Sequence, residues 1–138
     1  MNTLEKLYDI AEKENICINN YNWEIFKAMI FEIDSEYSIA LDKNLIHSST
    51  EEKEIIAEEL GHYYCNALYY INSDVILKSK CEYRAKKWAY SILVPFQNLK
   101  EKITQGFNLY DLAEYFDVDC EYMNDCINFY TDKYGILV

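Results

Sequence analysis

The sequence predicts an α+β fold, with a small antiparallel sheet early in the chain and helices through its second half. Lys27–Ile33 and Tyr37–Leu41 alternate apolar and polar residues on either side of the turn-like Asp34-Ser35-Glu36, which is typical of a β-hairpin. After Ser48 the apolar spacing becomes helical. The chain has 138 residues, 51% of them hydrophobic, so one compact domain can bury a core without a disulfide or metal to hold it together.

The elements before residue 66 are expected as follows. Residues 3–14 carry apolar side chains at helical spacing, and Ile16 and Ile18 alternate in a short extended segment. In the hairpin, Met29, Phe31 and Ile33 share one face. Ser49-Thr50-Glu51-Glu52 fits a capping box, in which the serine oxygen and the Glu52 carboxylate bind free backbone N–H groups. A helix is therefore predicted from about residue 50 to residue 66.

Three later helices are predicted from residues that begin or end helices as well as from the spacing of apolar residues. A helix over about 80–94 ends before Pro95, which disfavours helical geometry in the preceding residue. Asn108 precedes a short helix at 109–116, and a last helix covers 119–133 before Gly135. We expect one domain in three parts, residues 1–48, 49–95 and 96–138.

The charge is strongly negative, with 24 acidic and 13 basic side chains and a net charge of −11. This balance disfavours phosphate backbones and anionic lipid as partners. The charge is unevenly distributed, because residues 63–105 carry seven basic and three acidic side chains. The basic stretch over 78–87 is interpreted as a solvated helix face, and an acidic-peptide rim is the alternative.

The chain is predicted to be cytoplasmic. Its first residues lack the basic start and apolar core of a signal peptide, and no apolar run approaches the ~18 residues of a membrane helix. The five cysteines are odd in number and include no C-x-x-C pair. This pattern is typical of reduced thiols and not of a disulfide framework or zinc ribbon.

The segment with the most chemical information is Ala57-Glu58-Glu59-Leu60-Gly61-His62. Residues four apart share a helix face, so Glu58 and His62 project together, with Glu59 one step around the helix. This is the spacing of H-E-x-x-H, in which the outer residues bind a metal and the inner glutamate is the general base. Glutamate replaces the first histidine, and by spacing alone the pattern is weak, because any acidic helix can produce it.

Two further strings accompany the motif. Glu58-Glu59-Leu60-Gly61-His62-Tyr63-Tyr64 is followed by Glu82-x-x-Ala85-x-x-Trp88-Ala89-x-x-Ile92-Leu93-x-Pro95, and later by Asn108-x-Tyr110-Asp111-Leu112-Ala113-Glu114-Tyr115-Phe116-Asp117-Val118. Together they resemble the ImmA/IrrE family of metallopeptidase-like proteins, especially its short phage and mobile-element versions. The resemblance covers most of the chain and implies a small sheet packed on a zincin-like motif helix.

The resemblance also implies a metal site. Glu58, His62 and Glu82 would be the ligands, with Glu59 as the catalytic base and an open position for water, as in catalytic zinc sites. Glu58 makes the site harder and more negative than one with two histidines, so Mn²⁺ or Fe²⁺ becomes an alternative to Zn²⁺. A metal-free cleft of three carboxylates is the other alternative.

Four residues near the motif are candidates for accessory roles. Cys65 follows His62 by three positions and has the thiol of a soft ligand, and His47 precedes the motif helix. Tyr63 and Tyr64 have phenols that suit an oxyanion. For Cys65 and the tyrosines a place in the core is the favoured interpretation, and for His47 a surface or capping role.

Leu112–Val118 and the helix after it resemble the first half of a helix-turn-helix, but the second helix begins Asp119-Cys120-Glu121. Such an acidic start does not suit DNA reading. The family resemblance implies a phage or mobile-element regulator that cleaves or inactivates a partner helix-turn-helix repressor. The alternative is a metal-free pseudo-peptidase that acts as a protein-binding anti-repressor or as a toxin–antitoxin component.

Overall fold

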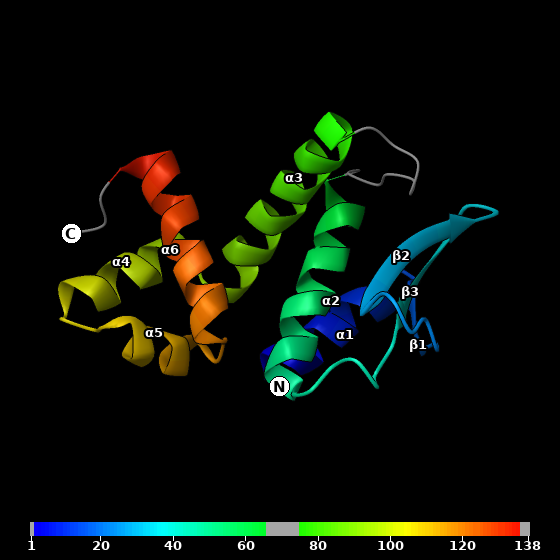
Figure 1. Ribbon diagram of the computed structural model, residues 1–138, viewed down its shortest axis with the longest axis horizontal. Coiled ribbons are helices and arrows are strands. Elements are labelled where there is room, and N and C mark those ends of the chain that lie inside the picture. Colours follow the sequence, from blue (N-terminus) through cyan, green and yellow to red (C-terminus); the bar gives the residue numbers. More distant parts are fainter. Residues whose placement is uncertain (1, 66–74, 136–138) are drawn as a thin grey trace. The chain divides into compact units, whose positions relative to one another are not determined.

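The computed structural model describes residues 2–65 and 75–135 and confirms the α+β class. Along the chain the elements are α1 (Thr3–Lys13), β1 (Cys17–Asn20), β2 (Ala28–Ile33), β3 (Glu36–Leu41), α2 (Ser49–Tyr64), α3 (Val75–Leu93), α4 (Phe96–Thr104), α5 (Leu109–Phe116) and α6 (Cys120–Tyr134) (Figure 1). They form two compact units, residues 1–89 and 90–138. The organisation as one domain stays a prediction.

The predicted hairpin is present, but the sheet is mixed, so the prediction of an antiparallel sheet holds only for the hairpin. β2 and β3 pair antiparallel, with Ile30 opposite Ile39, and Asp34 and Ser35 turn the chain at positive φ angles of 52° and 67°. β1 pairs with the other edge of β3 and runs parallel to it, giving the order β1-β3-β2. A loop long enough to carry the chain across β3 separates β1 from β2, which permits the parallel pairing.

The hairpin face that packs inward carries Ile30 and Ile39, which are 8% and 0% exposed. Met29, Phe31 and Ile33 do share a face, but it is the opposite one, and Ile33 is 62% exposed. α2 packs against β2, as Figure 1 shows, and α1 packs against α2. The core of the first unit therefore lies between this sheet face and the two helices, and its fully buried members are Leu7, Ile39, Leu41, Ile56 and Leu60.

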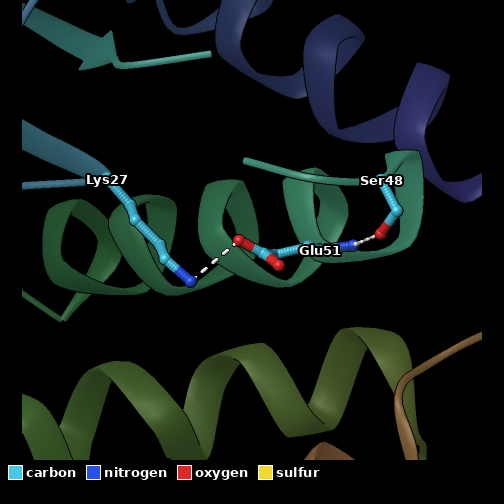
Figure 2. Close-up of polar contacts among 3 residues, drawn as sticks. All are labelled: Lys27, Ser48 and Glu51. Atoms are coloured by element: carbon cyan, nitrogen blue, oxygen red, sulfur yellow. Dashed lines mark hydrogen bonds and ion pairs between the residues drawn. The ribbon is translucent and has the colours of Figure 1, made fainter. Parts of the chain in front are cut away.

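The N-terminus of α2 is capped one residue earlier than predicted. The Oγ of Ser48, not of Ser49, accepts the hydrogen bond from the Glu51 N–H at 3.0 Å (Figure 2). The Glu51 carboxylate does not reach back to the cap, because it pairs with Lys27 at 2.9 Å. This ion pair links the residue before β2 to the first turn of α2.

The second unit holds α4, α5 and α6. The predicted short helix is confirmed as α5, where Asn108 and Asp111 form a reciprocal capping box. The Tyr130 hydroxyl donates to the Val94 carbonyl oxygen at 2.9 Å inside this unit. α4 was not predicted as a separate helix, because Leu99 is its one fully buried residue and Pro95 at its N-cap offers no side-chain cap.

α3 covers Val75–Leu93, so it includes the five residues before the predicted start at residue 80, and it ends before Pro95 as expected. None of the described helices is both long and apolar enough to cross a membrane.

Candidate metallopeptidase-type site

The site lies where α2 and α3 approach each other closely. A methyl group placed on Gly61 would meet the backbone of Ala85, with the Ala85 Cα only 2.9 Å away and its carbonyl oxygen nearer still. Ala85 is itself fully buried. The glycine in α2 and the alanine in α3 therefore let the two helices meet without intervening side chains.

This close approach brings together His62 of α2 and Glu82 of α3. The His62 Nε2 lies 3.3 Å from the Glu82 Oε1. The side chain of His62 is only 7% exposed, whereas that of Glu82 is 36% exposed. The structure thus joins two of the predicted site residues, which are twenty positions apart in sequence, into a contact between an imidazole and a carboxylate.

Glu59 projects from α2 toward the sheet. Its Oε2 accepts a hydrogen bond from the Ile30 N–H of β2 at 3.0 Å. The Asp42 N–H donates to the Lys27 carbonyl oxygen across the hairpin. Because hydrogen-bonding residues alternate along an antiparallel strand, Lys27, Met29 and Phe31 direct their backbone N–H and C=O groups toward β3, whereas Ala28 and Ile30 direct theirs away from it. The N–H of Ile30 therefore points to the free edge of β2, and Glu59 occupies that edge position.

The Glu59 carboxyl group has a pKa raised from 4.5 to about 7. Burial is the largest cause, because it penalises the charged form. The charge of His62 and the hydrogen bond from Ile30 lower the pKa, while the neighbouring charges of Glu58 and Glu82 raise it. A carboxyl group that titrates near neutral pH suits proton transfer in either direction.

Glu58 lies one helical turn before His62 and is partly buried. Within residues 2–65 and 75–135, however, no three His, Cys, Asp or Glu side chains stand close enough together to hold one metal ion. The conformation shown therefore assembles a two-residue contact, His62–Glu82, and not the predicted three-ligand set.

The accessory candidates are engaged elsewhere or exposed. The Cys65 Sγ lies 3.5 Å from the Arg84 carbonyl oxygen, and the Tyr63 hydroxyl donates to Glu14 at 2.8 Å. The Tyr64 ring stacks on Trp88, with centroids 4.9 Å apart. His47 is exposed and makes no hydrogen bond or ion pair within the described part of the chain.

Two features of the site were not found from the sequence. Ile30 takes part through its backbone N–H, which donates to Glu59. No side-chain pattern in the sequence indicates that a backbone N–H has this role. Gly61 did carry a signal, because a glycine inside a helix is unfavourable by about 1 kcal/mol relative to alanine and usually has a packing reason. A glycine inside the predicted helix indicates close packing there, but it does not identify Ala85 as the residue in contact.

The site thus combines a small sheet, a helix with Glu59 and the buried His62, and a second helix with the carboxylate of Glu82. This arrangement is compatible with a metallopeptidase-like fold. Comparison with protein families agrees: the family model Peptidase_M78, described as the IrrE N-terminal-like domain, matches residues 7–125. The chain therefore belongs to this family, as its resemblance to ImmA/IrrE proteins predicted. No curated protein and no solved structure matches the chain.

Proposed function

We propose that this protein is a metal-dependent endopeptidase-like regulator of a phage or mobile element, which cleaves or inactivates a partner helix-turn-helix repressor in the cytoplasm. The observation that supports the proposal best is the contact of His62 with Glu82 beside a Glu59 whose pKa is near 7. The imidazole of His62 and the carboxylate of Glu82 suit a divalent metal, and the carboxyl group of Glu59 suits a base. Membership of Peptidase_M78 supports the peptidase class.

The metal proposed is Zn²⁺, with Mn²⁺ or Fe²⁺ as alternatives, held by His62, Glu82 and Glu58. Glu58 precedes His62 by one turn of α2 and shares its face, and for this reason it is proposed as the third ligand. When bound, such a metal supplies a Lewis acid and an acidified water. The role of Glu59 is to hold and move a proton at its carboxyl group, and the Ile30 N–H orients that carboxyl.

A second candidate function is a metal-free pseudo-peptidase that inhibits its partner by contact, as an anti-repressor or toxin–antitoxin component. Two observations favour it. Glu58 stands in place of the usual histidine, and among the described residues no three His, Cys, Asp or Glu side chains stand close enough together to hold a metal ion. Both candidates use the same surface of α2 and α3.

The partner is proposed to be a protein and not DNA or a membrane. Residues 106–138 carry seven acidic side chains and one basic side chain, and most of these acids are exposed on α5 and α6. An exposed acidic surface repels the phosphate backbone. Absence of a gel shift with operator DNA at physiological salt is the expected result, and a shift would contradict this part of the proposal.

The deciding experiment measures metal content and partner cleavage together. We expect about one equivalent of a transition metal by mass spectrometry after reconstitution, and cleavage of a helix-turn-helix repressor from the same element. Glu59→Gln should retain metal and fold but lose cleavage, while the exposed Glu101→Gln serves as a matched control and should cleave normally. Less than one equivalent of every metal tested would overturn the peptidase proposal in favour of the metal-free one.

A further inference from the structure

The outward face of α1 is acidic. Glu5, Asp9 and Glu12 follow one another at intervals of four and three residues, so they form one stripe along the helix, with Tyr8 and Leu4 at its side. The stripe lines a shallow depression of about 430 Å³. Glu12 makes no ion pair with any described residue, whereas Asp9 pairs with Lys13 at 2.9 Å.

The outward face of α3 is basic and repeats this spacing. Lys80, Arg84 and Lys87 also follow at intervals of four and three, with Tyr83 and Ser79 at the side of the stripe. They line a depression of about 550 Å³. Lys80 and Arg84 are exposed and make no ion pair with any described residue, although α3 belongs to a protein with a net charge of −11.

The two faces match position by position. The three acidic residues on α1 and the three basic residues on α3 each extend over seven residue steps, about 10 Å along a helix. In each stripe a tyrosine immediately precedes the middle charged residue. If the two helices run antiparallel instead of parallel, the middle charged residue of one stripe is displaced by only one residue from that of the other. The opposite charges can therefore pair in either orientation. Both faces belong to the first compact unit, which presents them to solvent at the same time.

We propose that these faces form a contact between two copies of this chain, with the acidic face of α1 in one copy against the basic face of α3 in the other. The two faces carry opposite charges at matched spacing, and a contact between them does not depend on the peptidase proposal. Contact through two different faces gives either a two-fold dimer with the contact made twice or a head-to-tail series. The contact is weak, because exposed ion pairs each contribute little.

A second copy is favoured over another acidic protein because this chain itself supplies the matching stripe. The charge of −11 opposes association at long range, so attraction depends on the local pairing of the faces. Substitutions that reverse charge must therefore be compared at equal net charge, since a change of net charge alone alters the repulsion between copies.

The experiment follows the weight-average mass of the full chain by sedimentation over a concentration series. At the highest concentration we expect a rise of roughly 1.5-fold or more above the mass of one chain, as for a weak contact. Lys80→Glu with Arg84→Glu should abolish the rise. The control, Lys43→Glu with Lys100→Glu, changes two exposed lysines elsewhere to the same net charge and should reduce the rise much less.

The decisive test is a charge swap. Asp9→Lys with Glu12→Lys gives a chain with two basic faces, which should not self-associate, and circular dichroism verifies that α1 is intact. Mixing it with the Lys80→Glu, Arg84→Glu chain should restore association, because each basic face then meets an acidic one. Unchanged mass in the mixture would overturn the proposal. It would also be overturned if the unsubstituted chain stayed monomeric while poly-glutamate bound its α3 face, since another acidic protein would then be the occupant.

Discussion

Gly61 of α2 and the backbone of Ala85 in α3 are in such close contact that no side chain fits between them. This contact sets the separation of the two helices at the level of the site, one residue before His62 and three residues after Glu82. The 3.3 Å contact between His62 and Glu82 follows from it, because a wider separation would move the carboxylate beyond the reach of the imidazole.

Gly61→Ala is expected to destabilise the fold by about 1–3 kcal/mol, since the new methyl group clashes with backbone that cannot rotate away. The gain in helix propensity, about 1 kcal/mol, offsets only part of this cost. Urea unfolding measures the difference. Adding Ala85→Gly to the same chain should not restore stability, because the new methyl group clashes with backbone atoms of residue 85 and not with its side chain. Restored stability would mean that the Ala85 side chain, and not its backbone, limits the approach of the two helices.

Glu59→Gln is expected to change the pH dependence of stability. The folded pKa of Glu59 is about 7, against 4.5 for an unperturbed group, so the folded state holds a proton that the unfolded state releases between these pH values. The free energy of unfolding therefore falls as pH rises from 4.5 to 7, by up to about 3 kcal/mol. Glutamine does not ionise, so the variant should be more stable than the unsubstituted chain above pH 7 and similar to it below pH 4.5.

Unfolding of the chelator-treated protein at pH 5 and pH 8 tests this prediction, with the exposed Glu101→Gln as control. An equal effect of Glu59→Gln at both pH values would mean that Glu59 does not titrate in this range.

Ser48→Ala is expected to cost about 1 kcal/mol of stability, because the Glu51 N–H loses its acceptor at the N-terminus of α2. The neighbouring Ser49→Ala is a matched control, since Ser49 is already inside the helix and should cost much less. Thermal unfolding distinguishes the two. A larger loss from Ser49→Ala would restore the capping box predicted from the sequence.

His62→Ala and Glu82→Ala should each lower the affinity for added Zn²⁺ or Co²⁺ by on the order of tenfold or more, as expected when a ligand is removed. Isothermal titration gives the affinity, and Co²⁺ absorption shows whether the coordination changes. Glu114→Ala, an exposed glutamate in α5, is the control and should bind as the unsubstituted chain does. Equal affinities in all four proteins would remove His62 and Glu82 from the proposed ligand set.

Glu58→His should raise the affinity for Zn²⁺, because it restores the two-histidine spacing and imidazole suits zinc better than a second carboxylate. The same titration measures it, with competition by Mn²⁺ to follow selectivity. If Zn²⁺ affinity does not rise, position 58 does not contribute to a site, and the metal-free function is favoured.

Local signals predicted much of this fold. The helical spacing of α1 and α2, the cap at Asn108 and the stop before Pro95 depend on neighbours a few residues apart, and the structure has each of them. The family, too, was predicted from short strings of the sequence, and the match over residues 7–125 confirms it. Local signals were ambiguous at the two adjacent serines before α2, where Ser48 and not Ser49 is the cap, and the Glu52 carboxylate of the predicted capping box instead accepts from the Tyr8 hydroxyl.

The sequence alone determined which chemical groups are present: two adjacent glutamates in one helix, a histidine four residues after Glu58, and a carboxylate in the following helix. Only the tertiary structure decided how these groups meet. It brought His62 to Glu82, turned Glu59 to the Ile30 N–H and raised the pKa of Glu59 by burial. The physical reason is that helix spacing is a local property of the chain, whereas burial and contacts between helices depend on backbone packing, such as that of Gly61 on Ala85, which no single segment encodes.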